Sequence, residues 1–177
     1  MTNAELAILS LVAESPRHGY EIEQVIEQRN MREWTEIGFS SIYYLLKKLE
    51  KEKLIESSLE IAPRGPARKV YSATPAGMKT LQENVLQALS VPQPCYSPFQ
   101  LGLSNLPGIP PEQAISALYR YRQALVERLE TAKANWDAQK PLPYFVEAMF
   151  EHGIVLGEAE VKWIEKLIQV MESQPHP

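Results

Sequence analysis

The strongest structural signal in the chain lies at residues 39–55, FSSIYYLLKKLEKEKLI. Apolar side chains recur there with the i, i+3, i+4, i+7 spacing of an amphipathic α-helix. They form one stripe, made of Ile42, Leu45, Leu46 and Leu49. The segment is therefore predicted to be a helix that buries this stripe against other helices.

The opposite face of this helix combines hydroxyl, aromatic and cationic side chains. They are Ser40, Tyr44, Lys47 and Lys51, with Ser41 and Lys48 beside them. Either serine is suited to the N-cap position, and the whole face has the chemistry that binds phosphates and base edges. Charged residues opposite a core stripe are also typical of an ordinary solvated face, so this pattern alone leaves both interpretations open.

Two short strands are predicted after the helix, at residues 54–61 and 69–74. The turn between them, APRGPARK, contains proline and glycine and holds Arg64, Arg68 and Lys69. A helix-turn-helix followed by a hairpin with a basic tip is a winged helix, in which the helix enters a major groove and the wing contacts the flanking backbone.

Charge is distributed unevenly along the chain. Residues 39–79 contain eight Lys or Arg and four Glu, a local excess of four positive charges in a chain with a net charge of −4. This asymmetry is expected of a protein that binds DNA through one patch.

The segment before the recognition helix completes the winged-helix order. Helices are predicted from Asn3 to about residue 13 and at 18–29, with a polar loop at 30–38. His18 is interpreted as fixing the start of the second helix rather than binding metal. Tyr20 is either packed or contacts a phosphate through its hydroxyl.

Four stretches of the sequence resemble the PadR family of bacterial transcriptional regulators. They are AILSLV, HGYEI, GFSSIYYLLKKLEKEKLI and RGPARKVYSATPAGMKTL, which together span roughly residues 6–81. The resemblance implies that Ser41, Tyr43, Lys47 and Lys48 face DNA from the recognition helix. It also implies that Arg64, Arg68 and Lys69 lie in the wing.

Two positions depart from the family pattern. Tyr44 stands where the family usually has proline, which changes what the recognition helix presents to the operator. Lys53 stands where the family usually has a glycine that ends the helix. Lys53 must therefore either extend the helix or adopt a left-handed conformation at some energetic cost.

The C-terminal half is predicted to be helical, with helices at 75–90, 111–137, 144–156 and 158–171. The predicted domains are a winged-helix domain with a connecting helix (1–90), a Pro-rich connection (91–111) and a helical dimerisation domain (112–173). A heptad seam along the 111–137 helix suggests contact with a second chain. Its members are Ile115, Leu118, Leu125, Leu129, Ala132 and Trp136, with Arg122 as the polar exception. The layout and Trp163 resemble the PadR subfamily with a larger C-terminal dimerisation domain.

Several functional classes find no support in the sequence. There is no nucleophile–base set, P-loop, dinucleotide fingerprint or metal-ligand spacing, so neither an enzyme nor a cofactor is expected. No apolar run is long enough to span a membrane, and the first residues lack a basic signal region, which makes the cytoplasm the expected location.

The sequence therefore predicts a mostly α-helical, dimeric regulator that binds double-stranded operator DNA and acts as a ligand-responsive repressor. A palindromic operator is expected. The alternative is a winged-helix module that binds protein and not DNA. A small hydrophobic or aromatic effector is expected near the Pro-rich connection. The candidate lining residues are aromatic and are also compatible with a core or an interface: Trp34, Tyr119, Tyr121, Trp136, Tyr144, Phe145, Phe150 and Trp163.

Overall fold

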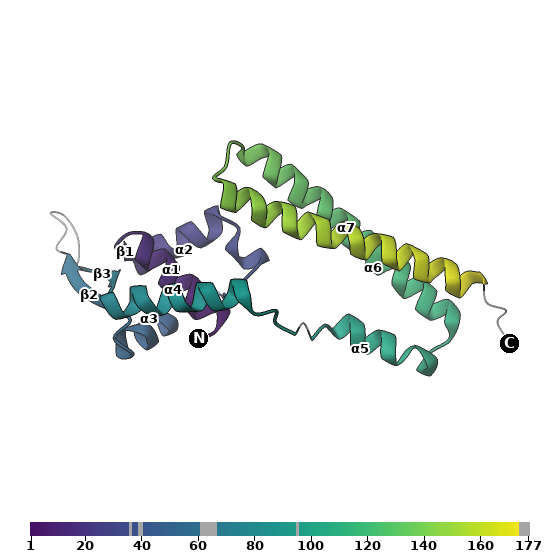
Figure 1. Ribbon diagram of the computed structural model, residues 1–177, viewed down its shortest axis with the longest axis horizontal. Coiled ribbons are helices and arrows are strands. Elements are labelled where there is room, and N and C mark those ends of the chain that lie inside the picture. The colour runs from purple at the N-terminus through teal and green to yellow at the C-terminus, as the bar shows by residue number, and fades with distance from the viewer. Residues whose placement is uncertain (36, 39–40, 61–66, 95, 174–177) are drawn as a thin grey trace. The chain divides into compact units, whose positions relative to one another are not determined.

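The computed structural model describes residues 1–35, 37–38, 41–60, 67–94 and 96–173 (Figure 1). The chain divides into two compact units, Met1–Pro94 and Cys95–Pro177. The first holds helices α1 to α4 and a small sheet, and the second is entirely helical in its described part.

The N-terminal unit has the element order of a winged helix. Its elements are α1 (Asn3–Glu14), β1 (Arg17–His18), α2 (Gly19–Gln28), a 3₁₀ turn (Met31–Glu33), α3 (Ile42–Lys51), β2 (Ile55–Glu60), β3 (Arg68–Ala73) and α4 (Pro75–Ser90). Thr2, and not Asn3, caps α1, because its hydroxyl accepts the Glu5 N–H while the Glu5 carboxylate accepts the Thr2 N–H. Thr74 caps α4 with Pro75 in the first turn.

The apolar stripe of α3 is the centre of the core. Ile42, Leu45, Leu46 and Leu49 are at most 6% exposed, as their spacing predicts. They pack with buried residues of the other elements: Ile8, Leu9, Leu11 and Val12 of α1, Ile22 and Ile26 of α2, Ile55 of β2 and Tyr71 of β3. The packing of α3 turns its opposite face outward.

The wing is an antiparallel sheet with strand order β1-β3-β2. The hairpin of β2 and β3 matches the two predicted strands, while β1 is a two-residue strand that sequence patterns did not reveal. It pairs Arg17 with Tyr71 and His18 with Val70, which joins the start of α2 to the wing. The predicted tip residues 61–66, including Arg64, lie outside the described residues.

The end of α3 resolves the two alternatives for Lys53. Its φ of 60° is left-handed, and the Leu54 N–H donates to the Leu49 carbonyl while the Lys53 N–H donates to the Glu50 carbonyl, each at 3.0 Å. This is a Schellman ending with lysine at the position that glycine usually occupies. The helix therefore stops at Lys51.

The second unit consists of α5 (Pro98–Ser104), a 3₁₀ turn (Leu106–Gly108), α6 (Pro111–Gln139) and α7 (Tyr144–Ser173). Figure 1 shows α6 and α7 side by side as a long hairpin. The two helices predicted at 144–156 and 158–171 are one continuous helix, which corrects that prediction. Gly157 does not end the helix: a Cβ there would lie 2.6 Å from Leu129 Cδ2, so the glycine permits close packing of α7 on α6.

The predicted seam of α6 is used inside this unit. Leu118 packs with Ile164 and Ile168 of α7 in a buried cluster. Partly buried Phe99, Ile115, Leu125, Leu167 and Met171 pack around the cluster. Part of the α6 seam that was predicted to contact a second chain is therefore buried against α7 of the same chain.

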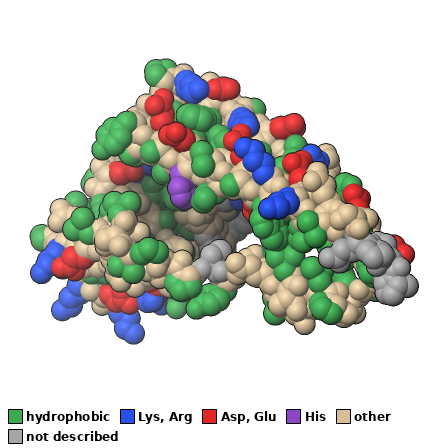
Figure 2. Space-filling view, turned by 45° about the vertical axis from the view of Figure 1, so that its right-hand side comes forward, with side chains coloured by type: hydrophobic (Ala, Val, Ile, Leu, Met, Phe, Trp, Pro, Cys, Tyr) green, Lys and Arg blue, Asp and Glu red, His purple; other side chains and the backbone are tan. Residues whose placement is uncertain are grey.

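The outer faces of α6 and α7 remain partly apolar. Hydrophobic side chains at least 45% exposed on α7 include Tyr144, Phe145, Met149, Val155, Leu156, Trp163 and Val170. In Figure 2, basic and acidic side chains alternate over the upper part of the molecule, with hydrophobic side chains between them. None of the described helices combines the length and the apolar composition needed to cross a bilayer.

Candidate nucleic-acid interface

The outward face of α3 carries most of the residues predicted to bind DNA. Tyr43 and Tyr44 are 60% and 67% exposed, and Lys47 and Lys51 are also exposed. Because the buried stripe fixes the rotation of α3, these four side chains are presented together to solvent. Their arrangement suits the insertion of the helix into a groove.

Ser41 occupies the N-cap position of α3 but does not cap it in the predicted way. Its hydroxyl donates to the Gly38 carbonyl at 2.7 Å, and no side-chain hydrogen bond caps the helix. Ser40, the other predicted cap and DNA-binding residue, lies outside the described residues.

Lys48 differs from its neighbour Lys47 because its ammonium group is ion-paired. It hydrogen-bonds to Glu5 of α1, whose side chain is only 8% exposed, and lies 3.9 Å from Glu52. The hydrogen bond from Lys48, followed by that from the Thr2 backbone, lowers the pKa of Glu5. In this structure Lys48 therefore ties α3 to α1, and its charge is already balanced by Glu5 before any contact with a phosphate.

Lys69 of β3 is paired in a similar way, with Glu50 in the last turn of α3. Its ammonium donates to both Glu50 oxygens at 2.8 and 2.9 Å, and Glu50 also accepts the Ser57 hydroxyl. The hydrogen bond from Lys69, with a smaller contribution from Ser57, lowers the pKa of Glu50. These contacts connect the C-terminal end of α3 to both strands of the wing.

Three cations near this surface have no ion pair among the described residues, namely Lys47 and Lys51 of α3 and Arg68 of β3. Lys51 belongs with Lys47 on the face first identified from the sequence. The structure therefore separates basic residues that were grouped together: Lys47, Lys51 and Arg68 are available, whereas Lys48 and Lys69 already have carboxylate partners.

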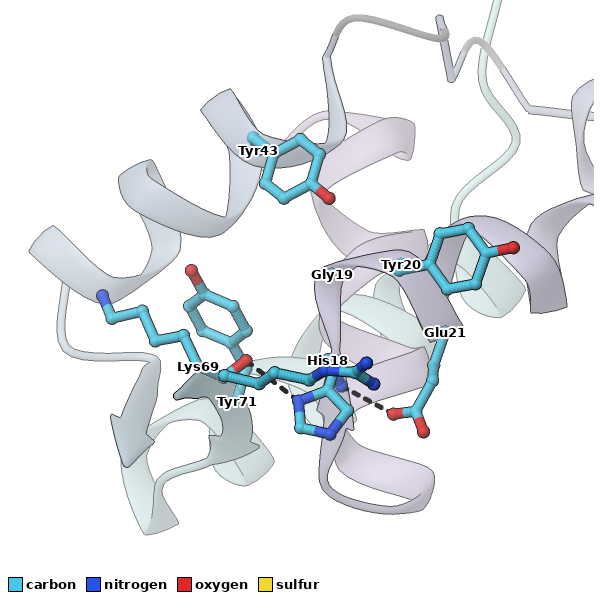
Figure 3. A pocket seen from close by; sticks show the side chains of 8 residues that line it. His18, Gly19, Tyr20, Glu21, Tyr43, Lys69 and Tyr71 are labelled. Atoms are coloured by element: carbon cyan, nitrogen blue, oxygen red, sulfur yellow. Dashed lines mark hydrogen bonds between the residues drawn. The ribbon is translucent and has the colours of Figure 1, made fainter. Parts of the chain in front are cut away.

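A hollow of about 400 Å³ lies where α3, the start of α2 and the wing meet (Figure 3). Its lining residues are His18, Gly19, Tyr20, Glu21, Tyr43, Arg68, Lys69 and Tyr71. Tyr20 is 63% exposed, so the structure favours the surface position over the packed one. The hollow brings Tyr20, Tyr43, Arg68 and Lys69 together from three separate segments.

His18 fixes the junction between α2 and the wing. It precedes the first residue of α2, and its backbone N–H donates to the Glu21 carboxylate at 2.7 Å. Its ring lies 3.4 Å from the Lys69 carbonyl oxygen and 3.4 Å from the Glu60 carboxylate. The structural role predicted for His18 agrees with these contacts, and the described residues contain no cluster suited to a metal ion.

Two features of the site were not predicted from the sequence. They are the close approach of Tyr43 to Gly19 and the pairing of Lys48 and Lys69 with carboxylates. The pairs join residues 43 and 19 positions apart, so no local spacing reveals them. Gly19 stands directly before Tyr20 in HGYEI, but its close approach to Tyr43 depends on how α2 packs against α3.

Several of the aromatic residues considered for an effector site make ring contacts within the helical unit. Phe99 stacks on Tyr121 with ring centroids 4.3 Å apart and meets Trp163 edge-on at 6.2 Å. Trp136 stacks on Phe150 at 6.2 Å. These contacts fit an ordinary helical core at least as well as a ligand site.

Comparison with solved structures shows the same fold. Bacillus subtilis PadR in complex with operator DNA has a TM-score of 0.77 and 19% identity, covering 94% of this chain and 98% of that chain. Bacillus subtilis PadR in complex with p-coumaric acid has a TM-score of 0.76 and 17% identity, covering 96% and 98%. The PadR-like regulator BC1756 from Bacillus cereus has a TM-score of 0.69 and 17% identity, covering 97% of each chain.

Sequence comparison supplies the family. The profile of the transcriptional regulator PadR-like family matches residues 8–83, which reach from α1 into α4. An uncharacterized protein of Lysinibacillus sphaericus is 36% identical over 78 residues, which make up 44% of this chain and 71% of that protein. The matched segment is the winged-helix unit with its outward-facing α3, and the chain belongs to the PadR-like family of transcriptional regulators.

Proposed function

We propose that this protein is a dimeric, ligand-responsive repressor that places α3 in the major groove of operator DNA and the wing on the flanking backbone. The observation that carries the proposal is the outward face of α3. There, Tyr43, Tyr44, Lys47 and Lys51 are exposed opposite a stripe that is almost completely buried. Hydroxyl and ammonium groups on one helix face can contact both base edges and phosphates.

Ser41, Tyr43, Tyr44 and Lys47 are the residues that we propose to contact base edges and phosphates at the major groove. Tyr20, Arg68 and Lys69 are those that we propose to contact the flanking backbone. For Lys48 and Lys69, the ammonium charge is already balanced by an intrachain carboxylate, which reduces the net gain of each contact with DNA. Ser40 and Arg64 stay predicted contacts on the sequence alone. A regulator of this kind acts where the chromosome lies, so the cytoplasm is the proposed location.

Dimerisation is proposed from the apolar surface that each unit leaves uncovered. On α4, Val85, Leu86 and Leu89 are 41%, 66% and 82% exposed, and α7 carries the exposed hydrophobic residues described above. Apolar surface of this extent is typical of interfaces between chains. A two-fold dimer would present α3 twice, which matches a palindromic operator.

An aromatic effector is proposed for the same protein. The solved structure of Bacillus subtilis PadR with p-coumaric acid shows that a protein of this fold binds a small aromatic acid. To change DNA affinity tenfold, an effector must bind the two conformations with affinities that differ by about 1.4 kcal/mol.

The test is fluorescence anisotropy with a duplex that the protein itself selects from a randomised library. We expect selective binding over a scrambled duplex and a steep loss of affinity with salt. Equal binding to both duplexes, or no binding at low salt, would instead favour the protein-binding alternative. Sedimentation of the same sample tests the dimer, and repeating the titration with aromatic acids tests the effector.

A further inference from the structure

The hollow beside α3 has firmly connected walls. Tyr71 at its base is 8% exposed, and Gly19 is buried. The β1–β3 pairing joins the backbone just before α2 to the strand that carries Arg68 and Tyr71. The hollow therefore holds its shape through the sheet and the core, and not through exposed side chains alone.

Gly19 leaves the space that the Tyr43 ring occupies. A Cβ on Gly19 would be 2.7 Å from Tyr43 Cε1, closer than real Cβ atoms approach, and 3.2 Å from Cζ, which is tighter than most such contacts. The ring can occupy its position only because residue 19 has no side chain. Figure 3 shows Tyr43 descending from α3 toward Gly19, with Tyr71 and His18 on the other side. Tyr43 is nevertheless 60% exposed, so its hydroxyl remains accessible from outside.

The charged groups around the hollow are not equally available. The Lys69 ammonium is bonded to Glu50, and the Glu21 carboxylate accepts the His18 backbone N–H. Arg68 is exposed and has no ion pair within the part of the chain that the structure describes. Its guanidinium is therefore the available cation of the hollow, and its planar fork matches two oxygens of a phosphate.

We propose that this hollow binds one backbone phosphate of the operator, next to the base pairs that α3 contacts. The Arg68 guanidinium and the Tyr43 hydroxyl donate to the phosphate oxygens, and Gly19 is a positioning residue because its lack of a side chain leaves room for the Tyr43 ring at the hollow. This inference rests on the proposed DNA-binding function and adds to it a specific subsite, which links α2, α3 and the wing through one phosphate.

Arg68 and Tyr43 should affect the salt dependence differently. Arg68→Ala removes one charged contact per protomer, so the log–log salt slope of a dimer should become shallower by about 2. Tyr43→Phe removes a neutral donor. It should weaken binding about tenfold at every salt concentration while the slope stays unchanged, because no counterion exchange is lost.

Gly19 is tested by a double-mutant cycle with Tyr43. Gly19→Ala should weaken binding about as much as Tyr43→Phe in the wild-type background and have no effect in a Tyr43→Ala background, where the colliding ring is absent. Gly38→Ala is the matched control, because the nearest described atom to its added Cβ is Ser41 Oγ at 3.7 Å. Thermal unfolding confirms that each full-length variant is folded.

These experiments distinguish a failure of the proposed DNA-binding function from a failure of the phosphate subsite alone. A wild-type protein without selective, salt-dependent binding to its selected duplex would refute the proposed function and this inference together. If the wild type binds selectively but Arg68→Ala keeps the wild-type slope, the phosphate is not in the hollow. An equal effect of Gly19→Ala with and without the Tyr43 ring would remove the positioning role of Gly19.

Discussion

Two adjacent lysines of α3 should behave differently when each is replaced by alanine. Lys47 is exposed and has no ion pair among the described residues, whereas the Lys48 ammonium hydrogen-bonds to the nearly buried Glu5. Lys47→Ala should therefore alter DNA binding with little change in stability. Lys48→Ala should lower stability with little change in the salt dependence of binding.

The magnitudes follow from a dimer that presents each lysine twice. Each phosphate contact contributes about 0.9 to the log–log salt slope, so Lys47→Ala should make the slope shallower by about 1.8. As an exposed substitution, it should change the free energy of unfolding by less than about 0.5 kcal/mol. Lys48→Ala should leave the slope within error of the wild type and lower the midpoint of thermal unfolding, since Glu5 loses its cation.

The assay is anisotropy of one labelled operator duplex over a series of salt concentrations, with thermal unfolding of the same samples. Lys162→Ala, in the helical unit, is the charge-matched control and should leave the slope unchanged. A slope that changes equally for Lys47→Ala and Lys48→Ala would show that Lys48 exchanges Glu5 for a phosphate, which would refute the reasoning from the ion pair.

Three further predictions concern stability. Lys53→Gly should raise the free energy of unfolding by about 1 kcal/mol, because φ at this position is left-handed. Chemical denaturation measures this change, and a lower free energy of unfolding for the glycine variant would show that Lys53 is not strained. Gly153→Ala should stabilise α7 by about 0.5–1 kcal/mol, since its added Cβ meets nothing within 4 Å; Gly157→Ala should lack this gain because it collides with Leu129, and equal effects would contradict the close packing. Hydrogen bonds from lysines lower the pKa values of Glu5 and Glu50 below 4.5, so their stabilising contribution is present above that value and is lost as pH falls through the depressed folded-state values. A variant with both Glu5→Gln and Glu50→Gln should therefore lose less thermal stability than the wild type when the pH is lowered.

Local patterns predicted the N-terminal unit well. The apolar spacing of Ile42 to Leu49 gave the position and buried face of α3, and Thr74-Pro75 gave the start of α4. Such signals involve residues within a few positions of one another, where helix geometry alone determines which side chains share a face. The same geometry placed Tyr44 and Lys47 on the outward surface.

Packing between distant segments accounts for the predictions that were wrong. Separate helices were predicted on the two sides of Gly157, but the chain continues there as the single helix α7, and the close approach to Leu129 suits a residue without a side chain. The strand β1 has only two residues, too few for a sequence pattern to predict it, and it is a strand because it pairs with β3. In both cases the partner segment determines the local structure.

The lysines show why a charge count identifies a DNA-binding region better than its contacts. The count of basic residues at 39–79 does not depend on which carboxylates fold beside them, and it correctly marked the winged-helix unit. Whether a given lysine is available depends on carboxylates elsewhere in the fold, and Glu5 lies 43 residues before Lys48. Moving a paired ammonium to a phosphate leaves Glu5 without a cation in a site that is 6% exposed, whereas Lys47 gives up only water. The free energy that each lysine contributes to DNA binding is thus determined by its partner in the free protein, and the two neighbours in the sequence are not equivalent.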